Sequence, residues 1–375
     1  MAFLNLREWF IRARQSSRQQ NITQEELDRI NAMFSTLAKA EPLARPSRYW
    51  EELNKMNLAQ LKEHGYDNFK RTLALNYFTW VRILPWDSQI AFLCKKLSIP
   101  AILRSFKTAF RISTQRYFSK IDVIQSFSYG LLGSLLWEYV LRIPLSEKLL
   151  ALREPQEGNP PLLHPRANMR VSQDLANSLL EYDSLQPAIR TPGTVLELGA
   201  GYGRNAFVIL SLHPNIKYVV VDIPPALWIS EQYLSGIFPE KRVFRYRDFE
   251  KFEDVADEYE NADVAFLLSS QLAALPPNSV DLVINISSLH EMRLDQVAYY
   301  IGRFDHVLRP GGHMYIKQWK EAKVLFEGVT LVEEDYPIPS GWTKMMSRTA
   351  RVQTRFFEAL YRKPPEATHS HQNSS

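Results

Sequence analysis

The sequence of 375 residues has very little cysteine and no long apolar run. Its one cysteine, Cys94, excludes an internal disulfide and a cysteine-rich metal site, because neither can be built from a single thiol. The nearest candidate for a membrane span, residues 127–136, is too short and is soon followed by Glu138, so we expect a buried helix there. The first residues lack a basic segment followed by an apolar one, which predicts no signal peptide. A reducing, cytoplasmic setting fits these absences.

Charge is distributed unevenly along the chain. Residues 1–180 contain 25 Lys and Arg against 16 Asp and Glu, a net charge of +9, and the remainder contains 20 against 25, a net charge of −5. The basic half suits a phosphorylated acceptor or weak contact with an anionic membrane surface, although solvated helix faces with surplus Lys and Arg would give the same count. No motif interleaves aromatic and basic residues, so we expect no nucleic-acid partner.

Residues 1 to about 150 are predicted to be helical. Apolar residues recur at intervals of three and four, as at Leu58 and Leu61, and few β-branched runs interrupt them. The Arg-rich start has the composition of a transit peptide, but Trp9 and its apolar neighbours favour an ordinary amphipathic first helix. In residues 153–165, repeated proline and glycine exclude both helix and central strand.

This proline-rich segment divides the predicted architecture into three parts. A helical cap or substrate region covers residues 1–165, and a second domain covers residues 166–363. The second domain is expected to open with a helix whose N-cap is Ser172. The polar residues 364–375 are expected to form a disordered tail.

From residue 194 the pattern changes to an alternation of strands and helices, which predicts a Rossmann-like parallel sheet covered on both faces. Two further strands, 329–334 and 355–362, are expected to form a C-terminal antiparallel hairpin, and residues 243–246 an edge strand. The expected parallel strands are 194–198, 218–222, 264–268, 281–286 and 313–318, and the expected helices are 203–212, 225–235, 270–275 and 294–308.

A glycine loop follows the first of these strands in the pattern Glu197-x-Gly199-x-Gly201-x-Gly203. Glycines let the chain turn tightly at a strand end and approach a ligand closely. A dinucleotide motif needs its third glycine three residues after the second, whereas here the interval is two. The loop therefore favours contact with the methionine part of S-adenosylmethionine (SAM) over a pyrophosphate, with Arg204 assisting at the start of the next helix.

The second and third strands also end in polar residues. Asp222 lies 19 residues after Gly203, beside Ile223, where a carboxylate can accept hydrogen bonds from ribose hydroxyls, although it could instead cap the following turn. After the third strand, Ser270 and Gln271 lie where an adenine would be bound, or they cap a helix.

The strand 281–286 is followed by further candidate site residues. Ligands of open α/β sheets bind beyond the carboxyl ends of strands where the strand order reverses, which places Asn285 and Ser287 near the cofactor. His290 has the chemistry of a general base for an acceptor hydroxyl, with Glu291 orienting it or acting as the base itself. Alternatively, His290 only packs beneath the loop.

The last predicted parallel strand ends in Lys317 and Trp319, which we expect to contact the acceptor. Trp319 would stack on a sugar face, or it belongs to the core. No cluster of metal-ligating residues is evident, so we expect no metal.

These elements together resemble the class I SAM-dependent methyltransferases over residues 190–320. More narrowly, the chain is similar to the sugar O-methyltransferase family associated with bacterial polysaccharide and glycosylated-metabolite pathways. The resemblance implies SAM as cofactor and transfer of its methyl group to a sugar hydroxyl. The motifs that carry it are Glu154-Pro155, Gly158-Asn159-Pro160, Ser172-Gln173-Asp174-Leu175, Gly199-Ala200-Gly201-Tyr202-Gly203-Arg204, Val221-Asp222-Ile223-Pro224-Pro225-Ala226-Leu227, Asn285-Ile286-Ser287-Ser288-Leu289-His290-Glu291-Met292 and Lys317-Gln318-Trp319.

Two alternatives remain open from the sequence. The acceptor could be a lipid, a polyketide or an amine instead of a sugar or glycosylated molecule. The chain could also be a binding protein that retains the fold without catalysis. The oligomeric state is not predicted.

Overall fold

The structure is a computed structural model that describes residues 22–72, 85–113, 122–164, 169–324 and 328–366. The expected first helix around Trp9 lies outside these ranges, as does the expected tail after residue 366. The described residues before the proline-rich segment are helical, as predicted. Their elements are α1 (Gln24–Lys39), η2 (Pro42–Ala44), α2 (Arg48–His64), η3 (Tyr66–Asn68), α3 (Phe69–Thr72), α5 (Ser88–Lys96), α6 (Ile99–Ser113), α7 (Asp122–Val140) and α8 (Glu147–Leu150).

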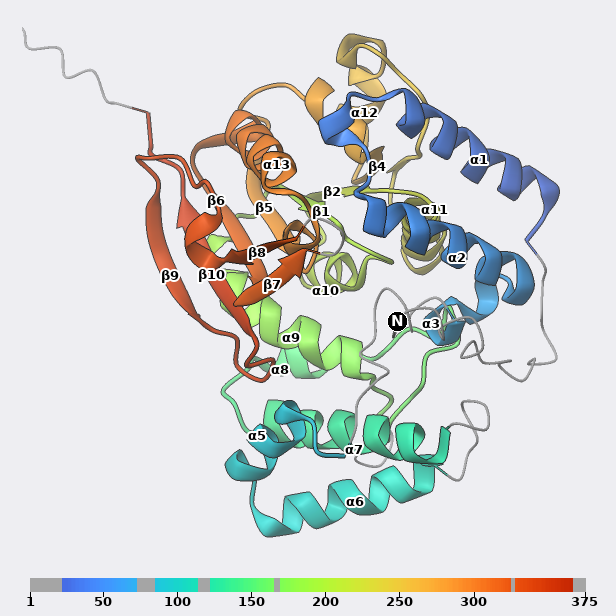
Figure 1. Cartoon of the computed structure of the whole chain (residues 1–375), viewed down its shortest axis with the longest axis vertical. Coiled ribbons are helices and arrows are strands. Elements are labelled where there is room, and N and C mark those ends of the chain that lie inside the picture. Colours follow the sequence, from blue (N-terminus) through green and yellow to red (C-terminus); the bar gives the residue numbers. More distant parts are fainter. Residues whose placement is uncertain (1–21, 73–84, 114–121, 165–168, 325–327, 367–375) are drawn as a thin grey trace, which may run out of the picture.

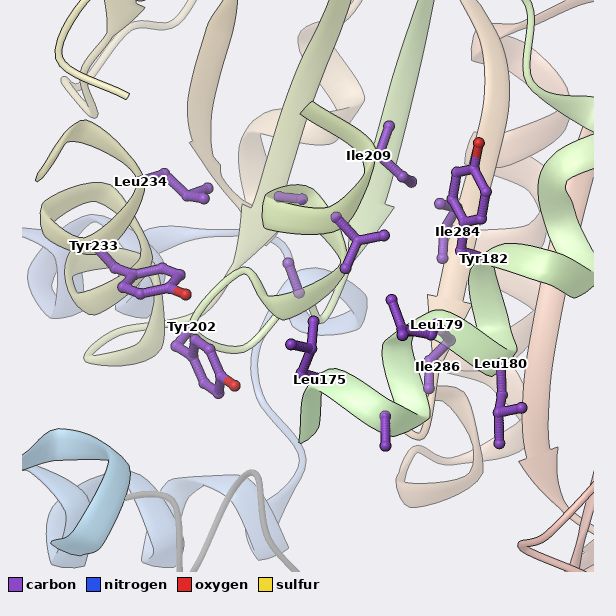
Figure 2. Close-up of a cluster of buried hydrophobic side chains, with 14 of the residues drawn as sticks. Leu175, Leu179, Leu180, Tyr182, Tyr202, Ile209, Tyr233, Leu234, Ile284 and Ile286 are labelled. Carbon is purple, nitrogen blue, oxygen red and sulfur yellow. The ribbon is translucent and has the colours of Figure 1, made fainter. Parts of the chain in front are cut away.

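Helix α9 (Gln173–Leu185) joins these helices to the second half of the chain. The Ser172 side chain accepts a hydrogen bond from the Leu175 N–H, so the predicted N-cap is confirmed. Twelve of its thirteen residues are buried, because α7 packs on one side and α10 (Arg204–Leu212) on the other. Figure 2 shows apolar side chains of α9, such as Leu175 and Leu179, gathered with side chains from α10, α11 (Ala226–Ile237) and β5 (Val280–Ile286).

An eight-stranded sheet forms the second half, in the order β3-β4-β2-β1-β5-β6-β10-β9 (Figure 1). Neighbours from β3 to β6 are parallel, whereas β10 runs antiparallel to both β6 and β9. The strands are β1 (Gly193–Leu198), β2 (Ile216–Asp222), β3 (Val243–Phe244), β4 (Val264–Leu268), β5 (Val280–Ile286), β6 (Leu308–Trp319), β9 (Thr343–Thr349) and β10 (Phe356–Arg362). The predicted Rossmann-like α/β fold and its five parallel strands are thereby confirmed, and β3 is the expected edge strand.

Helices cover both faces of the sheet, and most of them lie where they were predicted, whereas the helix in residues 256–261 was not predicted. They are α10, α11 (Ala226–Ile237), α12 (Ala256–Asn261) and α13 (Leu294–Val307), and the predicted helix 270–275 is a 3-10 helix, η6 (Ser269–Ala274). The glycine-rich turn at residues 309–312 falls inside β6 and shifts its register, since Val280 pairs with Leu308 but Leu282 pairs with His313.

The predicted C-terminal antiparallel hairpin is present, but it joins β9 and β10, so the predicted partner strand 329–334 is wrong. Strand β8 (Val329–Val332) pairs with β7 (Glu321–Val324) in a separate two-stranded sheet. The true partner of β10 is β9, whose sequence Thr-Lys-Met-Met-Ser-Arg-Thr is exposed at six of its seven positions. An edge strand that buries neither face has no apolar alternation, so the usual sequence signal for a strand is missing.

Apolar residues on the two faces of the sheet belong to two cores. In β1, Val195 belongs to the core that also contains the N-terminal helices, whereas Leu196 and Leu198 belong to the opposite core under α13. The N-terminal helices therefore bury their apolar faces against α9 to α11 and one face of the sheet. Figure 1 shows α1 and α2 on one flank of the sheet domain and α5 to α7 beyond α9.

Candidate functional site

A cavity of about 300 Å³ lies at the carboxyl ends of β1 and β5, where the strand order reverses. Ligands of open α/β sheets bind at this switch point. Ten predicted site residues line the cavity: Glu197, Gly199, Gly201, Arg204, Asp222, Ile223, Ser287, His290, Glu291 and Trp319. The other five, Gly203, Ser270, Gln271, Asn285 and Lys317, do not line it.

The glycine loop is shaped by close contacts as well as by its own turn. Gly199 and Gly201 have φ values of 73° and 60°, in the left-handed region that favours glycine. A Cβ atom on Gly199 would lie 2.6 Å from the Ser288 hydroxyl, so glycine lets the loops after β1 and β5 approach. Gly203 is the N-cap of α10, and a Cβ there would lie 2.9 Å from Leu234, which explains its place outside the cavity.

Asp222 ends β2 with its carboxylate in the cavity wall. Its Oδ2 accepts from the Gly201 N–H and its Oδ1 from the Ile223 N–H, both at 2.7 Å. Among the described residues no cation forms an ion pair with it, and burial raises the pKa of Asp222 to about 7. Each oxygen retains a lone pair, so this carboxylate can accept hydrogen bonds from two neighbouring hydroxyls of a ligand.

Arg204 belongs to a buried cluster of charges below the glycine loop. Its guanidinium donates to both carboxylate oxygens of Glu181 and to the Ser178 hydroxyl. Lys317 Nζ also donates to Glu181, at 2.7 Å, which explains why Lys317 lies outside the cavity. These cations lower the pKa of Glu181 to about 2 despite its burial. Arg204 also lines the cavity, so its guanidinium suits the carboxylate of a ligand.

Glu197 is held beneath the same loop by two side chains. Tyr218 donates its hydroxyl to Oε2 at 2.6 Å, and the Asn205 amide donates to Oε1 at 3.0 Å. Burial raises the pKa of Glu197 to about 7. This carboxylate therefore braces the loop from below while also lining the cavity.

A chain of amide groups fixes the imidazole of His290. The Asn285 amide nitrogen donates to the Leu198 carbonyl at 2.9 Å, so its Oδ1 must face the Gln318 amide nitrogen, 2.6 Å away. Gln318 Nε2 also donates to the Asn285 carbonyl, which orients Oε1 toward the backbone N–H and Nδ1 of His290, at 3.2 and 2.8 Å. Because an amide oxygen only accepts, Nδ1 carries the proton and Nε2 is left as an acceptor.

The second nitrogen of His290 faces a carboxyl group. Nε2 lies 3.8 Å from Glu291 Oε1, and both residues line the cavity. Burial lowers the pKa of His290 to about 4 and raises the pKa of Glu291 to about 8. The imidazole is therefore neutral at physiological pH. A ligand hydroxyl between the two side chains would meet an imidazole acceptor on one side and a carboxyl group on the other.

Three polar residues that were predicted to contact the cofactor, Asn285, Gln271 and Ser270, do not line the cavity. Asn285 belongs to the amide chain behind His290. Gln271 accepts from the Leu268 N–H and donates to the Arg247 carbonyl, both at 2.9 Å, so it closes η6. Ser270 is half-buried and does not line the cavity, whereas its neighbour Ser269 does.

The N-terminal region supplies a wall that the sequence analysis did not assign to particular residues. Tyr49 and Trp50, at the start of α2, line the cavity, and Trp50 Nε1 donates to Glu291 Oε2 at 2.8 Å. The preceding η2 is held by α13, since Gln296 donates to the Arg45 carbonyl at 2.8 Å. Trp50 and Glu291 are 241 positions apart in the sequence, so no local pattern could predict their contact.

Helix α9 supplies another unassigned wall through Asp174, Asn177 and Glu181. Their spacing of three and four places them on one face of the helix. Burial raises the pKa of Asp174 to about 7, and Tyr202 donates its hydroxyl to it at 3.0 Å. The recurrence of polar residues at this spacing was the available signal in the sequence.

Two features are absent from the described ranges. No group of three His, Cys, Asp or Glu side chains there is placed to hold a metal ion. None of the described helices has the length and apolar character needed to cross a membrane.

Part of the chain is similar in sequence to known methyltransferases. Residues 196–314 match a family described as a methyltransferase domain. Human acetylserotonin O-methyltransferase is 26% identical over 120 residues, which are 32% of this chain and 28% of that protein. O-methyltransferase 3 of Dictyostelium discoideum is 21% identical over 173 residues, 44% of this chain and 36% of that protein. The chain thus spans about a third of the length of these relatives.

Solved structures of low sequence identity were also found. Mitomycin 7-O-methyltransferase is 16% identical, with 51% of this chain and 57% of that chain covered and a TM-score of 0.33. The 1,6-didemethyltoxoflavin N1-methyltransferase of Burkholderia thailandensis, with bound S-adenosylhomocysteine, is 17% identical, with 50% and 76% covered and a TM-score of 0.34.

The residues at the switch point fit SAM. Asp222 offers a ribose a buried carboxylate that has no cationic partner among the described residues. The guanidinium of Arg204 in the cavity wall offers a partner to the methionine carboxylate. The bend at Gly201 leaves the backbone open to the cavity. Residues 196–314, with the strand order around them, are therefore a class I SAM-dependent methyltransferase domain, and SAM is its cofactor.

Proposed function

We propose that this chain is an O-methyltransferase that transfers the methyl group of SAM to a hydroxyl of a sugar or glycosylated acceptor. The observation that carries the proposal is the fixed tautomer of His290, whose unprotonated Nε2 is held in the wall of the same cavity that contains Asp222. A hydroxyl needs a base as it attacks, because it is barely ionised at neutral pH.

SAM supplies the reactive methyl group when bound. The chain positions and protects the reactants: Asp222 binds the ribose, and Arg204 with the glycine loop binds the methionine part. His290 Nε2 accepts the proton of the attacking hydroxyl, and Glu291 orients that hydroxyl from the other side. The walls formed by α2 and α9 exclude water and hold the acceptor in line.

Several features support a sugar as acceptor. Trp319 lines the cavity with its ring tilted by 32° and 5.7 Å from the His290 ring, and an indole face suits the C–H face of a sugar. Ser47, Asn177 and Gln353 add polar groups to the wall. The resemblance of the motifs to the sugar O-methyltransferase family favours the same acceptor class.

An aromatic hydroxyl is the second candidate acceptor. Tyr49, Trp50 and Trp319 give the cavity an aromatic lining, and a human relative of the matched region is an acetylserotonin O-methyltransferase. Aromatic rings stack on flat acceptors as readily as on sugars. Stacking alone does not distinguish the two acceptor classes. A sugar has more hydroxyl groups than a phenol, so it would use more of the polar groups in the wall.

A transfer assay with methyl-labelled SAM tests the proposal. Panels of sugar nucleotides, oligosaccharides, glycosylated aromatic compounds and free phenols are incubated with the full chain and with His290→Ala. We expect label on a sugar hydroxyl, and a loss of kcat of about 10²–10⁴ in the variant, the usual contribution of a general base, with SAM affinity unchanged. Label on phenols alone would favour the second candidate. SAM binding without transfer to any acceptor would indicate a non-catalytic binding protein.

A further inference from the structure

A second cavity, of about 790 Å³, shares Trp319 with the cavity at the switch point. Small-molecule sites have volumes of about 300–1,000 Å³, so it is large enough to hold a ligand of its own. Its walls come from the β7–β8 hairpin, from the end of β6 and from the residues of β9 and β10 nearest their connecting turn. Figure 1 shows this hairpin beside β6 and β10.

The β7–β8 hairpin is anchored next to the proposed base. Ala322, Val324 and Leu331 are buried in the core under α13, whereas Glu321 is exposed and lines the second cavity. Strand β7 also contacts η7 (Leu289–Glu291), the short helix that carries His290. One wall of the second cavity is therefore fixed to the element that holds the reacting groups.

Trp319 is the junction between the two cavities. Its ring lies 5.7 Å from that of His290 and 5.9 Å from that of Phe356, at the start of β10. The side chain is only partly buried, so some of the indole is accessible to a ligand. A molecule with one hydroxyl beside His290 Nε2 would enter the second cavity with whatever part of it extends past this indole.

Polar side chains of both charges line the second cavity. Arg348 already pairs with Glu358, and Glu333 pairs with Lys344. The other charged residues among the described part of the lining are exposed, two of them basic and two acidic: Lys320, Arg355, Glu321 and Glu334. A ligand with a net charge of either sign would meet like charges here. A neutral compound rich in hydroxyls can donate to the carboxylates and accept from the cations, and Thr349 and Thr354 add hydroxyls to the wall.

We propose that the second cavity binds the part of the acceptor beyond the methylated sugar, so that the acceptor is a neutral oligosaccharide. This inference rests on the proposed transfer to a sugar hydroxyl. The methylated unit would lie between His290 and Trp319, and the following units would bond to the charged and hydroxyl groups past the indole. Binding energy from such remote units is used at the reacting centre, so a truncated acceptor loses kcat/KM.

Acceptors of different length test this inference with the full chain. Each sugar that the transfer assay labels is offered as the single unit and as neutral oligosaccharides of that unit. Thr349→Trp places a large ring in the second cavity, and Thr343→Trp, exposed on the same strand but outside the cavity, is the matched control. We expect kcat/KM to rise roughly tenfold or more from the single unit to the oligosaccharide in the wild type and the control, as a few added hydrogen bonds would give.

In Thr349→Trp this ratio of kcat/KM should fall toward one, with SAM affinity unchanged. Arg355→Ala, which removes a charge without adding bulk, should lower the ratio in the same direction. Equal kcat/KM for short and long acceptors in the wild type, or a length preference that both variants retain, would overturn the inference and leave transfer to a sugar intact. Label on no saccharide would contradict the proposed function, and this inference with it. Melting curves verify that the variants are folded.

Discussion

Replacing Asp222 by asparagine should flatten the pH dependence of SAM binding. In the unliganded chain, burial raises the pKa of Asp222 to about 7, so the carboxyl group is protonated below that pH. Ribose hydroxyls donate to the ionised form and lower its pKa in the complex, so wild-type affinity rises with pH. If only the ionised form binds, the apparent Kd is multiplied by about 11 at pH 6 and about 1.1 at pH 8, a change of about tenfold.

Calorimetry at several pH values, in buffers of different ionisation enthalpy, measures both the affinity and the protons released. At pH 7 the Asp222 carboxyl should release about half a proton on SAM binding. Glu291, with its pKa of about 8, titrates in the same range and in the same direction when the cationic sulfonium binds. The decisive quantity is therefore the difference between the wild type and Asp222→Asn.

We expect Asp222→Asn to bind SAM more weakly at pH 8 and to lose most of the tenfold change between pH 6 and pH 8. Circular dichroism and the melting temperature verify that the isosteric variant is folded. Equal pH slopes and equal proton release in the two proteins would refute the assignment of this carboxylate to the ribose.

Two further predictions concern the acceptor side of the cavity. Gln318→Met removes the acceptor of the hydrogen bond from His290 Nδ1. We expect kcat to fall by about 10²-fold or more, while SAM affinity changes little. Long-range ¹H–¹⁵N spectra should show that the His290 tautomer is no longer fixed. An unchanged tautomer in the folded variant would contradict the amide chain. Trp50→Phe removes the N–H that donates a hydrogen bond to Glu291. Because this hydrogen bond stabilises the ionised carboxylate, its loss should raise the pKa of Glu291 above 8 and move the pH–rate profile to higher pH. A profile that stays in place would show that this hydrogen bond does not act on the reaction.

Much of the fold could be predicted because the parallel strands are buried on both faces. Such strands appear as short apolar runs ending in polar residues, and β1, β2, β4 and β5 were identified in this way. Strand β9 was missed because its side chains are exposed, so it has no apolar pattern. Strand β8 was assigned to the wrong partner because the local sequence of a strand does not show which other strand it pairs with.

The candidate site was predictable where the topology alone brings residues together. The ends of β1, β2 and β5 converge at the switch point, so the glycine loop, Asp222 and His290 were expected to share a cavity, and they line one. The wall containing Trp50 depends on how the N-terminal helices dock on the sheet, which follows from apolar burial over many residues. No short motif encodes that docking.

The amide chain explains why neutral side chains stand behind His290. A carboxylate at position 318 would also accept the Nδ1 proton, but it would attract a second proton to the ring and raise the pKa of His290 toward neutrality. The Gln318 amide fixes the tautomer without adding charge, so the pKa of His290 remains near 4 and Nε2 stays unprotonated throughout the neutral range. The backbone carbonyls of Leu198 and Asn285 set the direction of the amides. The strands that form the cofactor crevice therefore also determine which nitrogen of His290 faces the acceptor.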